Sequence, residues 1–483
     1  EAGATPEQEL AFALATATAV LDELQERVPA HDFPKLVGRI SFFVNAGIRF
    51  VTEMCKMRAF VDLWDEICET RYGVENPKYR RFRYGVQVNS LGLTEQQPEN
   101  NVYRILIEML AVTLSKNARA RAVQLPAWNE ALGLPRPWDQ QWSMRMQQIM
   151  AFETDLLEYE DLFDGNPTIE AKVARLKDEA RHELASLDAL GGAIEAIGYM
   201  KSRLVESNTQ RLNKIASKET TVVGVNKFTT GEPSPLTAGD GGIMTVDPAV
   251  EQDQVDRLNA WRCARDDASV ASALRSLRAA AQAGENIMPA SIAAAKAGVT
   301  TGEWAAQMRL IYGEYRGPTG VARGVSNQSE GLDEIREAVD LVSQKLGRRL
   351  GFLMGKPGLD GHSNGAEQIA ARARDCGMEI AYDGIRLTPE QLISSVQEHQ
   401  PHVIGLSILS GSHIPLVEDM MKRLQLAQLD NIPVVVGGII PQEDMTRLTA
   451  MGVAKIYTPK DFELNAIMMD IVSLADPTDL AAE

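Results

Sequence analysis

The sequence has few of the features that build disulfide frameworks, zinc sites or membrane spans. Its 483 residues include four cysteines, and none of them forms a Cys-x-x-Cys pair. Scattered cysteines argue against disulfides and zinc and are compatible with a reducing compartment. No apolar run reaches the roughly 18 residues that a transmembrane helix requires. We therefore expect a cytoplasmic protein with no membrane partner.

Positive charge is also in deficit. Lys and Arg number 49 against 66 Asp and Glu, which gives a net charge of -17 and makes nucleic acid an unfavourable partner. An anionic ligand would likewise need a site with its own local Arg or Lys. Apolar residues make up 45% of the chain, as in ordinary soluble globular proteins, and the length allows two or three domains.

The amino-terminal half alternates between apolar runs typical of strands and amphipathic stretches typical of helices. Three strand–helix repeats indicate parallel βα units, and three units are too few to close an eight-stranded barrel. Strands are predicted at 39–48, 83–90, 120–125 and, more weakly, 221–226, and helices at 6–28, 51–70, 102–115, 142–157 and 167–216.

The remainder divides into a linker and a second domain. Residues 231–247 are rich in Gly, Pro and Thr, which indicates a linker, and 248–313 are Ala-rich and helical. From residue 347 onward, five strand–helix repeats predict a flavodoxin-like doubly wound α/β domain. The domains predicted are 1–230, 231–346 and 347–483, with strands of the last near 350–354, 378–382, 402–409, 432–438 and 454–458.

One loop of this last domain carries the most distinctive chemistry. Asp360, His362 and Gly365 follow a buried strand and precede a helix predicted at 366–376. They therefore lie at the carboxyl end of a strand, where open α/β sheets bind ligands. A carboxylate two residues from a histidine can fix its tautomer for metal binding. A solvated loop histidine is the alternative that this motif alone leaves open.

Two later strands end in polar or glycine residues at the same edge of the predicted sheet. The set Asp-x-His-x-x-Gly, then Ser-x-Leu, then Gly-Gly resembles the cobalamin-binding domain of B12-dependent mutases and methionine synthase. The resemblance implies that His362 is the lower axial ligand of cobalt, replacing the cofactor's dimethylbenzimidazole. Asp360 would hold His362, and Lys356 would extend that hydrogen-bond chain. The other cofactor-binding residues implied are Gly361, Gly365, Ser407, Leu409, Gly437, Gly438 and Tyr457, the serine and the paired glycines beside the nucleotide tail.

The chain as a whole resembles the methylmalonyl-CoA mutase family, with residues 1–230 as part of a (β/α)8 barrel. Residues 119–140 are closest to the branch that acts on ethylmalonyl-CoA. The resemblance implies adenosylcobalamin as cofactor, an acyl-CoA substrate, a homodimer, and radical rearrangement of ethylmalonyl-CoA to methylsuccinyl-CoA. The matching segments are Glu1-Ala2-Gly3-Ala4, Arg39-Ile40-Ser41-Phe42-Phe43, Leu93-Thr94-Glu95-Gln96 and Val223-Gly224-Val225-Asn226-Lys227.

Residue roles follow from the same resemblance. Arg39 and Ser41 match positions that contact CoA, and Gly85 stands where the methylmalonyl pattern has a histidine. The positions near the corrin and the adenosyl group are Glu1, Gln87 and Glu130.

Catalytic residues are expected upstream of Glu1, so we expect the carboxyl-terminal part of an enzyme, inactive as a mutase when isolated. The alternatives are methylmalonyl-CoA mutase, a non-catalytic cobalamin-binding chain, and a corrinoid methyltransferase, a class that lacks this barrel segment.

Overall fold

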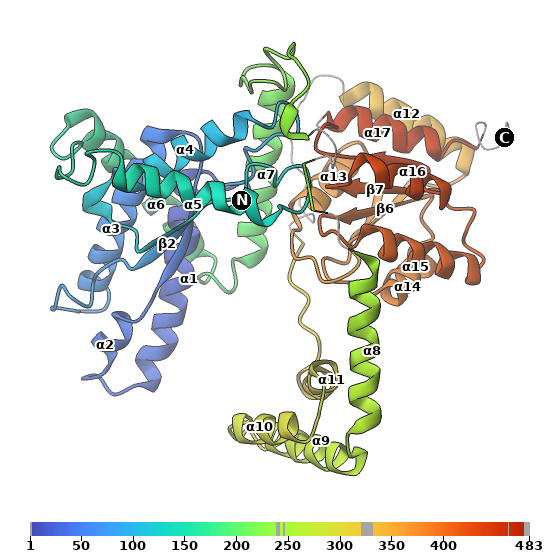
Figure 1. Cartoon of the computed structure of the whole chain (residues 1–483), viewed down its shortest axis with the longest axis horizontal. Coiled ribbons are helices and arrows are strands. Elements are labelled where there is room, and N and C mark those ends of the chain that lie inside the picture. The colour runs from blue at the N-terminus through green and yellow to red at the C-terminus, as the bar shows by residue number, and fades with distance from the viewer. Residues whose placement is uncertain (1, 238–241, 245–246, 320–331, 462, 478–483) are drawn as a thin grey trace. The chain divides into compact units, whose positions relative to one another are not determined.

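The computed structural model describes residues 2–237, 242–244, 247–319, 332–461 and 463–477 (Figure 1). In the amino-terminal half, β1 (Phe42–Ala46), β2 (Tyr84–Val88) and β3 (Ala122–Gln124) form a parallel sheet in the order β1-β2-β3. Helix α3 (Phe50–Thr70) connects the first two strands and α4 (Asn100–Thr113) the second and third. The predicted parallel βα units are confirmed.

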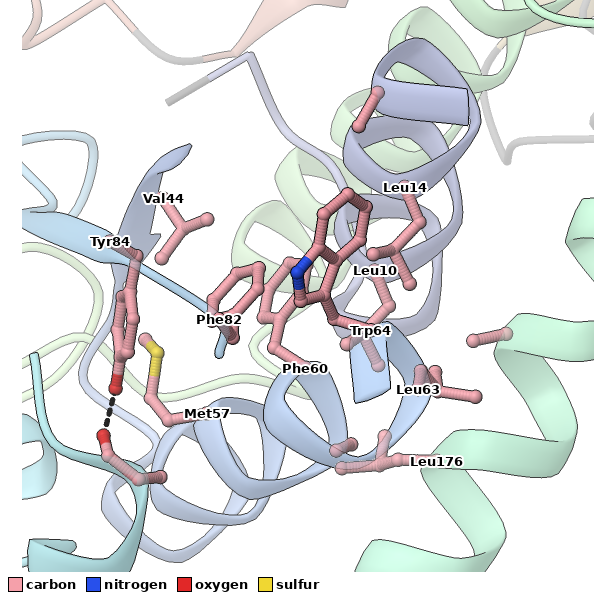
Figure 2. Close-up of a cluster of buried hydrophobic side chains, with 14 of the residues drawn as sticks. Leu10, Leu14, Val44, Met57, Phe60, Leu63, Trp64, Phe82, Tyr84 and Leu176 are labelled. Carbon is pink, nitrogen blue, oxygen red and sulfur yellow. Dashed lines mark hydrogen bonds between the residues drawn. The ribbon is translucent and has the colours of Figure 1, made fainter. Parts of the chain in front are cut away.

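One face of this three-stranded sheet packs on a helical core. Tyr84, Val86 and Val88 alternate along β2 with side chains that are less buried, as a strand with two unlike faces requires. Figure 2 shows Val44 and Tyr84 facing side chains of α3, among them Met57. Side chains of α1 (Pro6–Arg27) and α6 (Pro167–Ala189) also belong to this core. Its other members labelled in Figure 2 are Leu10, Leu14, Phe60, Leu63, Trp64, Phe82 and Leu176.

Three predictions in this half were wrong in detail. The stretch 167–216 is two helices, α6 and α7 (Ile197–Ala216), because Gly191 and Gly192 both have positive φ angles, which end the first helix. Residues 221–226 form no strand, and Val223 makes only an isolated bridge. Helix α5 (Pro137–Phe152) begins earlier than residue 142, because proline suits a first helical turn and Asp139 accepts a hydrogen bond from the backbone of Arg136.

Residues 245–317 form a compact unit of their own, and the helices predicted there are confirmed. Val270, Leu277 and Ala281 of one helix and Ala294 of the next make up its buried apolar positions. The helices are α8 (Pro248–Ala264), α9 (Asp267–Gln282), α10 (Met288–Lys296) and α11 (Thr301–Tyr312).

The carboxyl-terminal sheet has five parallel strands in the order β5-β4-β6-β7-β8. This is the flavodoxin-like order of the doubly wound fold, so the predicted fold of this domain is confirmed. The strands are β4 (Gly351–Gly355), β5 (Glu379–Ala381), β6 (Val403–Ile408), β7 (Val434–Gly438) and β8 (Lys455–Tyr457).

Helices cover both faces of that sheet and give it two apolar cores. Helices α12 (Leu332–Leu346), α13 (Asn364–Asp375) and α17 (Leu464–Leu474) pack in one core. Helices α14 (Pro389–His399), α15 (His413–Leu426) and α16 (Gln442–Ala450) pack in the other. Helix α12 lies in the stretch assigned to the linker, and the domain boundaries at 231 and 347 stay predictions.

In the described part of the chain, no helix combines the length and the apolarity that a membrane crossing requires. Short helices complete the fold: α2 (Phe33–Val37) and two 3₁₀ turns, η1 (Lys116–Ala118) and η2 (Pro235–Thr237).

Candidate functional site

The loop of the Asp-x-His-x-x-Gly motif lies at the topological switch point of the carboxyl-terminal sheet. The chain passes from β4 outward to β5 and then crosses back to β6 on the other side of β4. The loops that follow β4 and β6 therefore diverge from neighbouring strand ends, which is where doubly wound sheets bind ligands.

Asp360 holds this loop to the end of β6. Its Oδ2 accepts hydrogen bonds from Lys356 Nζ at 2.6 Å and from the backbone N–H of Leu409 at 3.1 Å. Its Oδ1 accepts from the backbone N–H of His362 at 3.0 Å and lies 2.7 Å from His362 Nδ1. Lys356 Nζ also donates to the carbonyl oxygen of Ser407 at 3.3 Å. The structure thus brings five predicted residues into one network.

Lys356 and Asp360 form a buried ion pair at the centre of this network. The Lys356 side chain is 0% exposed and that of Asp360 is 4% exposed. Burial lowers the pKa of Lys356, and the hydrogen bond to Asp360 offsets part of that effect. Burial opposes ionisation of Asp360, but hydrogen bonds from Lys356 and from His362 hold the pKa of that carboxyl well below its usual range. An ion pair this deeply buried costs much to break by removing one partner.

The imidazole of His362, by contrast, stands in the open, with 71% of its side chain exposed. A proton on Nδ1, donated to Asp360, leaves the lone pair of Nε2 for a metal ion. With its proton on Nδ1, the ring has the tautomer that ligation by Nε2 requires.

Strand β7, which pairs with β6, ends in two glycines whose surroundings differ. Gly438 pairs with Ile408, and a Cβ at position 438 would lie 1.9 Å from the carbonyl oxygen of Ile408. Gly437 pairs with Ser407 on one side and Tyr457 on the other, and the nearest heavy atom to its Cβ position is 4.0 Å away. Gly438 is therefore required for the close pairing of β6 and β7, while Gly437 leaves open space at the edge where a ligand would bind.

The remaining cofactor candidates of this domain lie at the same edge. Gly361 is beside Arg386, whose Nη2 would lie 3.1 Å from a Cβ there. Gly365 lies in the first turn of α13, with nothing within 4 Å of its Cβ position. The hydroxyl of Tyr457 donates to Asp470 at 3.1 Å, and burial raises the pKa of that phenol.

The candidates of the amino-terminal half lie around the three-stranded sheet. Gly85 and Gln87 are on the half-buried face of β2, opposite the face that packs on the core. Arg39 and Ser41 are exposed and precede β1, so they lie at the amino-terminal end of the sheet. Glu130 follows β3 in a turn. Glu1 lies outside the described residues.

Sequence patterns gave no sign of a second set of residues beside the motif loop. Helix α7 contacts α13 through buried polar side chains, among them Thr209 and Gln368. Thr209 and Gln368 are separated by more than 150 residues in the sequence. Each is a polar residue of a kind that is common on helix surfaces. Only the helical spacing of polar residues in a stretch that is otherwise amphipathic would have pointed to them.

Comparison with known proteins agrees with this division of the chain. A family model described as methylmalonyl-CoA mutase matches residues 1–314, and one described as B12 binding domain matches residues 351–461. The ethylmalonyl-CoA mutase of Cereibacter sphaeroides is 73% identical over all of this chain and 74% of its own length. That of Methylorubrum extorquens is 60% identical over 99% of this chain and 70% of its own length. The methylmalonyl-CoA mutase of Escherichia coli is 31% identical over 98% of this chain and 66% of its own length.

Proposed function

The chain belongs to the methylmalonyl-CoA mutase family, and from this premise we propose that it catalyses the adenosylcobalamin-dependent rearrangement of ethylmalonyl-CoA to methylsuccinyl-CoA. Its much higher identity to two proteins named ethylmalonyl-CoA mutase than to a methylmalonyl-CoA mutase is the observation that carries this choice of substrate.

The residues at the switch point fit a cobalamin. A single imidazole suits a metal whose equatorial positions a macrocycle already fills. His362 would bind cobalt through Nε2, while Asp360 accepts the proton on Nδ1 and Lys356 holds the carboxylate. An outer partner of this kind sets the orientation of the ring and raises its basicity as a ligand.

The nucleotide tail would lie along the strand ends. Gly437 leaves open space at its Cβ position, which suits close passage of a ligand past the backbone. Ser407 is its partner across β6 and β7, and Leu409 is already held by Asp360. The further contacts proposed for the cofactor are those of Gly361, Gly365, Gly438 and Tyr457.

The substrate would lie along the half-buried face of the three-stranded sheet. A five-residue strand spans about 17 Å, so an extended thioester can reach from Arg39 and Ser41 at the amino end to Gln87 near the carboxyl end. The exposed guanidinium of Arg39 suits a CoA phosphate. Gly85 lies between these ends, where it leaves room for the acyl group, and Glu130 follows the neighbouring strand.

Adenosylcobalamin held at this edge would supply the radical chemistry that the rearrangement requires. The protein binds and orients both ligands and excludes side reactions. His362, oriented by Asp360, would hold the cofactor at the end of β4, and the sheet face of Gly85 and Gln87 would receive the acyl group.

An assay with adenosylcobalamin and either ethylmalonyl-CoA or methylmalonyl-CoA tests the proposed function. It should be run on the 483-residue chain and on any longer protein that contains it. We expect ethylmalonyl-CoA to have the higher kcat/KM and His362→Ala to abolish turnover. Reversed values would indicate a methylmalonyl-CoA mutase. Cobalamin binding without turnover of either substrate, in the 483-residue chain and in any longer protein alike, would indicate a cobalamin-binding chain.

The axial ligand has its own test. Electron paramagnetic resonance of the Co(II) form bound to ¹⁵N-labelled protein should show splitting from a protein nitrogen, and this splitting should disappear in His362→Ala. Splitting from the benzimidazole of the cofactor would contradict the assignment.

The CoA contact is tested by Arg39→Ala, which should raise KM for the acyl-CoA roughly 10- to 150-fold, because a lost charge-assisted hydrogen bond costs about 1.5–3 kcal/mol. The affinity for cobalamin should not change. Arg175→Ala, on an exposed position of α6, is the matched control.

Family membership also supports two proposals on organisation: a homodimer and a cytoplasmic location. Light scattering of the purified protein tests the first, and fractionation of cells tests the second.

A further inference from the structure

Helix α7 presents a row of polar residues to α13, the helix that begins two residues after His362. Thr209 Oγ1 lies 2.7 Å from Gln368 Oε1 and 2.8 Å from the carbonyl oxygen of Val205, and Gln368 Nε2 donates to that same carbonyl oxygen at 2.9 Å. Thr209 is 4% exposed and Gln368 is 3% exposed, so both polar groups are withdrawn from water. Among the described residues Thr209 is the donor to Gln368 Oε1, so loss of its hydroxyl leaves a buried amide oxygen unpaired.

The same row continues toward the motif loop. Lys201 Nζ lies 2.6 Å from Glu367 Oε1 and 3.3 Å from the hydroxyl of Ser363, the residue directly after His362. Asn208 Nδ2 donates to Asn364 Oδ1 at 3.0 Å. Positions 201, 205, 208 and 209 fall on one face of a helix, which is why they meet a single partner.

A neighbouring part of α7 holds the amino-terminal segment of the chain. Ser207 Oγ donates to the carbonyl oxygen of Gly3 at 2.6 Å. A Cβ at Gly3 would lie 2.5 Å from Cβ of Asn208, and Gly3 has a φ of 89°. Only glycine suits a backbone that is both so close to α7 and left-handed. Helix α7 therefore contacts both the segment that follows Glu1 and the helix that follows His362.

We propose that Lys201, Thr209 and Gln368 are positioning residues for the cobalt ligand. Buried hydrogen bonds and ion pairs require a defined geometry, so a shift of α13 along α7 would break several of them at once. An apolar contact would tolerate such a shift. The polar contacts between α7 and α13 therefore fix the position of the first turn of α13. They thereby fix the position of His362 relative to the amino-terminal segment. This inference rests on the proposed role of His362 as axial ligand.

The test uses Thr209→Val, which keeps the shape of the side chain and removes its hydroxyl, and Lys201→Met, which removes the charge from a partly exposed pair. Adenosylcobalamin is titrated into each variant, and the Co(II) form is examined by electron paramagnetic resonance with ¹⁵N-labelled protein. We expect a five- to tenfold rise in Kd and a smaller fraction of cobalt with a protein nitrogen ligand. Hydrogen exchange of the cofactor-free chain should become faster in residues 361–368.

Two variants serve as controls. Thr209→Ser restores the hydroxyl and should return Kd to the original value. Ser202→Ala removes another hydroxyl of α7, one that donates to the carbonyl oxygen of Gly198 within the same helix, and should leave Kd unchanged.

The outcomes separate this inference from the proposed function. If the unaltered chain shows no protein nitrogen on cobalt, the assignment of His362 fails and the inference fails with it. If the unaltered chain shows a protein nitrogen on cobalt, and Thr209→Val and Lys201→Met have the same Kd and the same spectrum as that chain, only the inference is overturned. This holds even if the unfolding midpoint of the variants falls. If Thr209→Val does not fold, Lys201→Met decides.

Discussion

Gly438 lies so close to Ile408 across the β6–β7 pair that a Cβ at position 438 would be 1.9 Å from the carbonyl oxygen of Ile408. No side-chain rearrangement relieves this overlap, because the atom it meets is backbone. The preceding glycine is not constrained in this way, since 4.0 Å separates its Cβ position from the nearest heavy atom, Cβ of Tyr457. Adjacent glycines of one motif therefore meet different requirements.

Alanine substitutions should separate these two requirements. Gly438→Ala should destabilise the domain by about 1–3 kcal/mol, the usual cost of forcing an extra carbon into a packed site. Gly437→Ala should leave the unfolding midpoint unchanged and weaken cobalamin binding, because the methyl group occupies space proposed for the nucleotide tail. Urea unfolding and cobalamin titration measure the two effects. Normal affinity in a stable Gly437→Ala protein would place the tail elsewhere.

Asp360→Asn should weaken cobalamin binding by about 10- to 100-fold, the usual effect of removing the group that orients a metal-binding histidine. The amide cannot accept both hydrogen bonds from His362 and the ammonium of Lys356 as a carboxylate does. Absorbance titration of the base-off form measures the change. Asp430→Asn, at an exposed position before β7, is the control and should bind normally. Unchanged affinity in Asp360→Asn would show that the ring is oriented without its partner.

The carboxyl-terminal sheet could be predicted from sequence because its strands are buried on both faces. All positions of β4 and β6 are buried, so they form short continuous apolar runs between turn residues. The motif residues follow those runs directly, and parallel strands bring their carboxyl ends to one edge. Strand ends alone therefore predict that Asp360, His362, Ser407 and Leu409 lie at one edge, and the family resemblance adds Lys356.

Other features depend on tertiary contacts that a local pattern does not contain. The apolar character of 221–226 predicted a strand, but no neighbouring strand pairs with it beyond one bridge, from Val223 to Lys227. The pairing of Thr209 with Gln368 joins two helices of ordinary composition and is decided by how they dock. The predicted start of α5 at residue 142 was wrong for another reason. Pro137 marks the first helical turn, and this local signal was present in the sequence.

Glu108 provides a prediction of pH dependence. Burial, together with the nearby charge of Glu53 and against the effect of Arg104, raises the pKa of Glu108 to about 9. Above pH 4.5 the unfolded chain loses this proton while the folded chain keeps it, so the free energy of unfolding falls until the pH reaches about 9. Glu108→Gln removes this loss. Its stability relative to the unaltered protein should rise by about 2–3 kcal/mol between pH 6 and pH 8, at about 1.4 kcal/mol per pH unit.

Urea unfolding at several pH values measures this difference. Glu26→Gln, at an exposed position of α1, is the control and should show no comparable trend. A constant difference between Glu108→Gln and the unaltered protein over that pH range would show that Glu108 is ionised in the folded state.

Gly85→His should shift substrate preference toward methylmalonyl-CoA. Gly85 and Gln87 lie on the half-buried face of β2, and a Cβ at position 85 would be 3.1 Å from the ring of Phe43, its neighbour on β1. Phe43 is 61% exposed, so its ring can turn aside and admit an imidazole. That imidazole would fill space next to the acyl group. One methylene of substrate is worth about 1–3 kcal/mol, so the ratio of the two kcat/KM values should change roughly 10- to 200-fold without exclusion of either substrate.

Gly85→Ala is the control for strand stability and should change the ratio much less. If both activities fall together while the ratio stays constant, Gly85 serves the close approach of β1 and β2, and substrate choice is made by other residues.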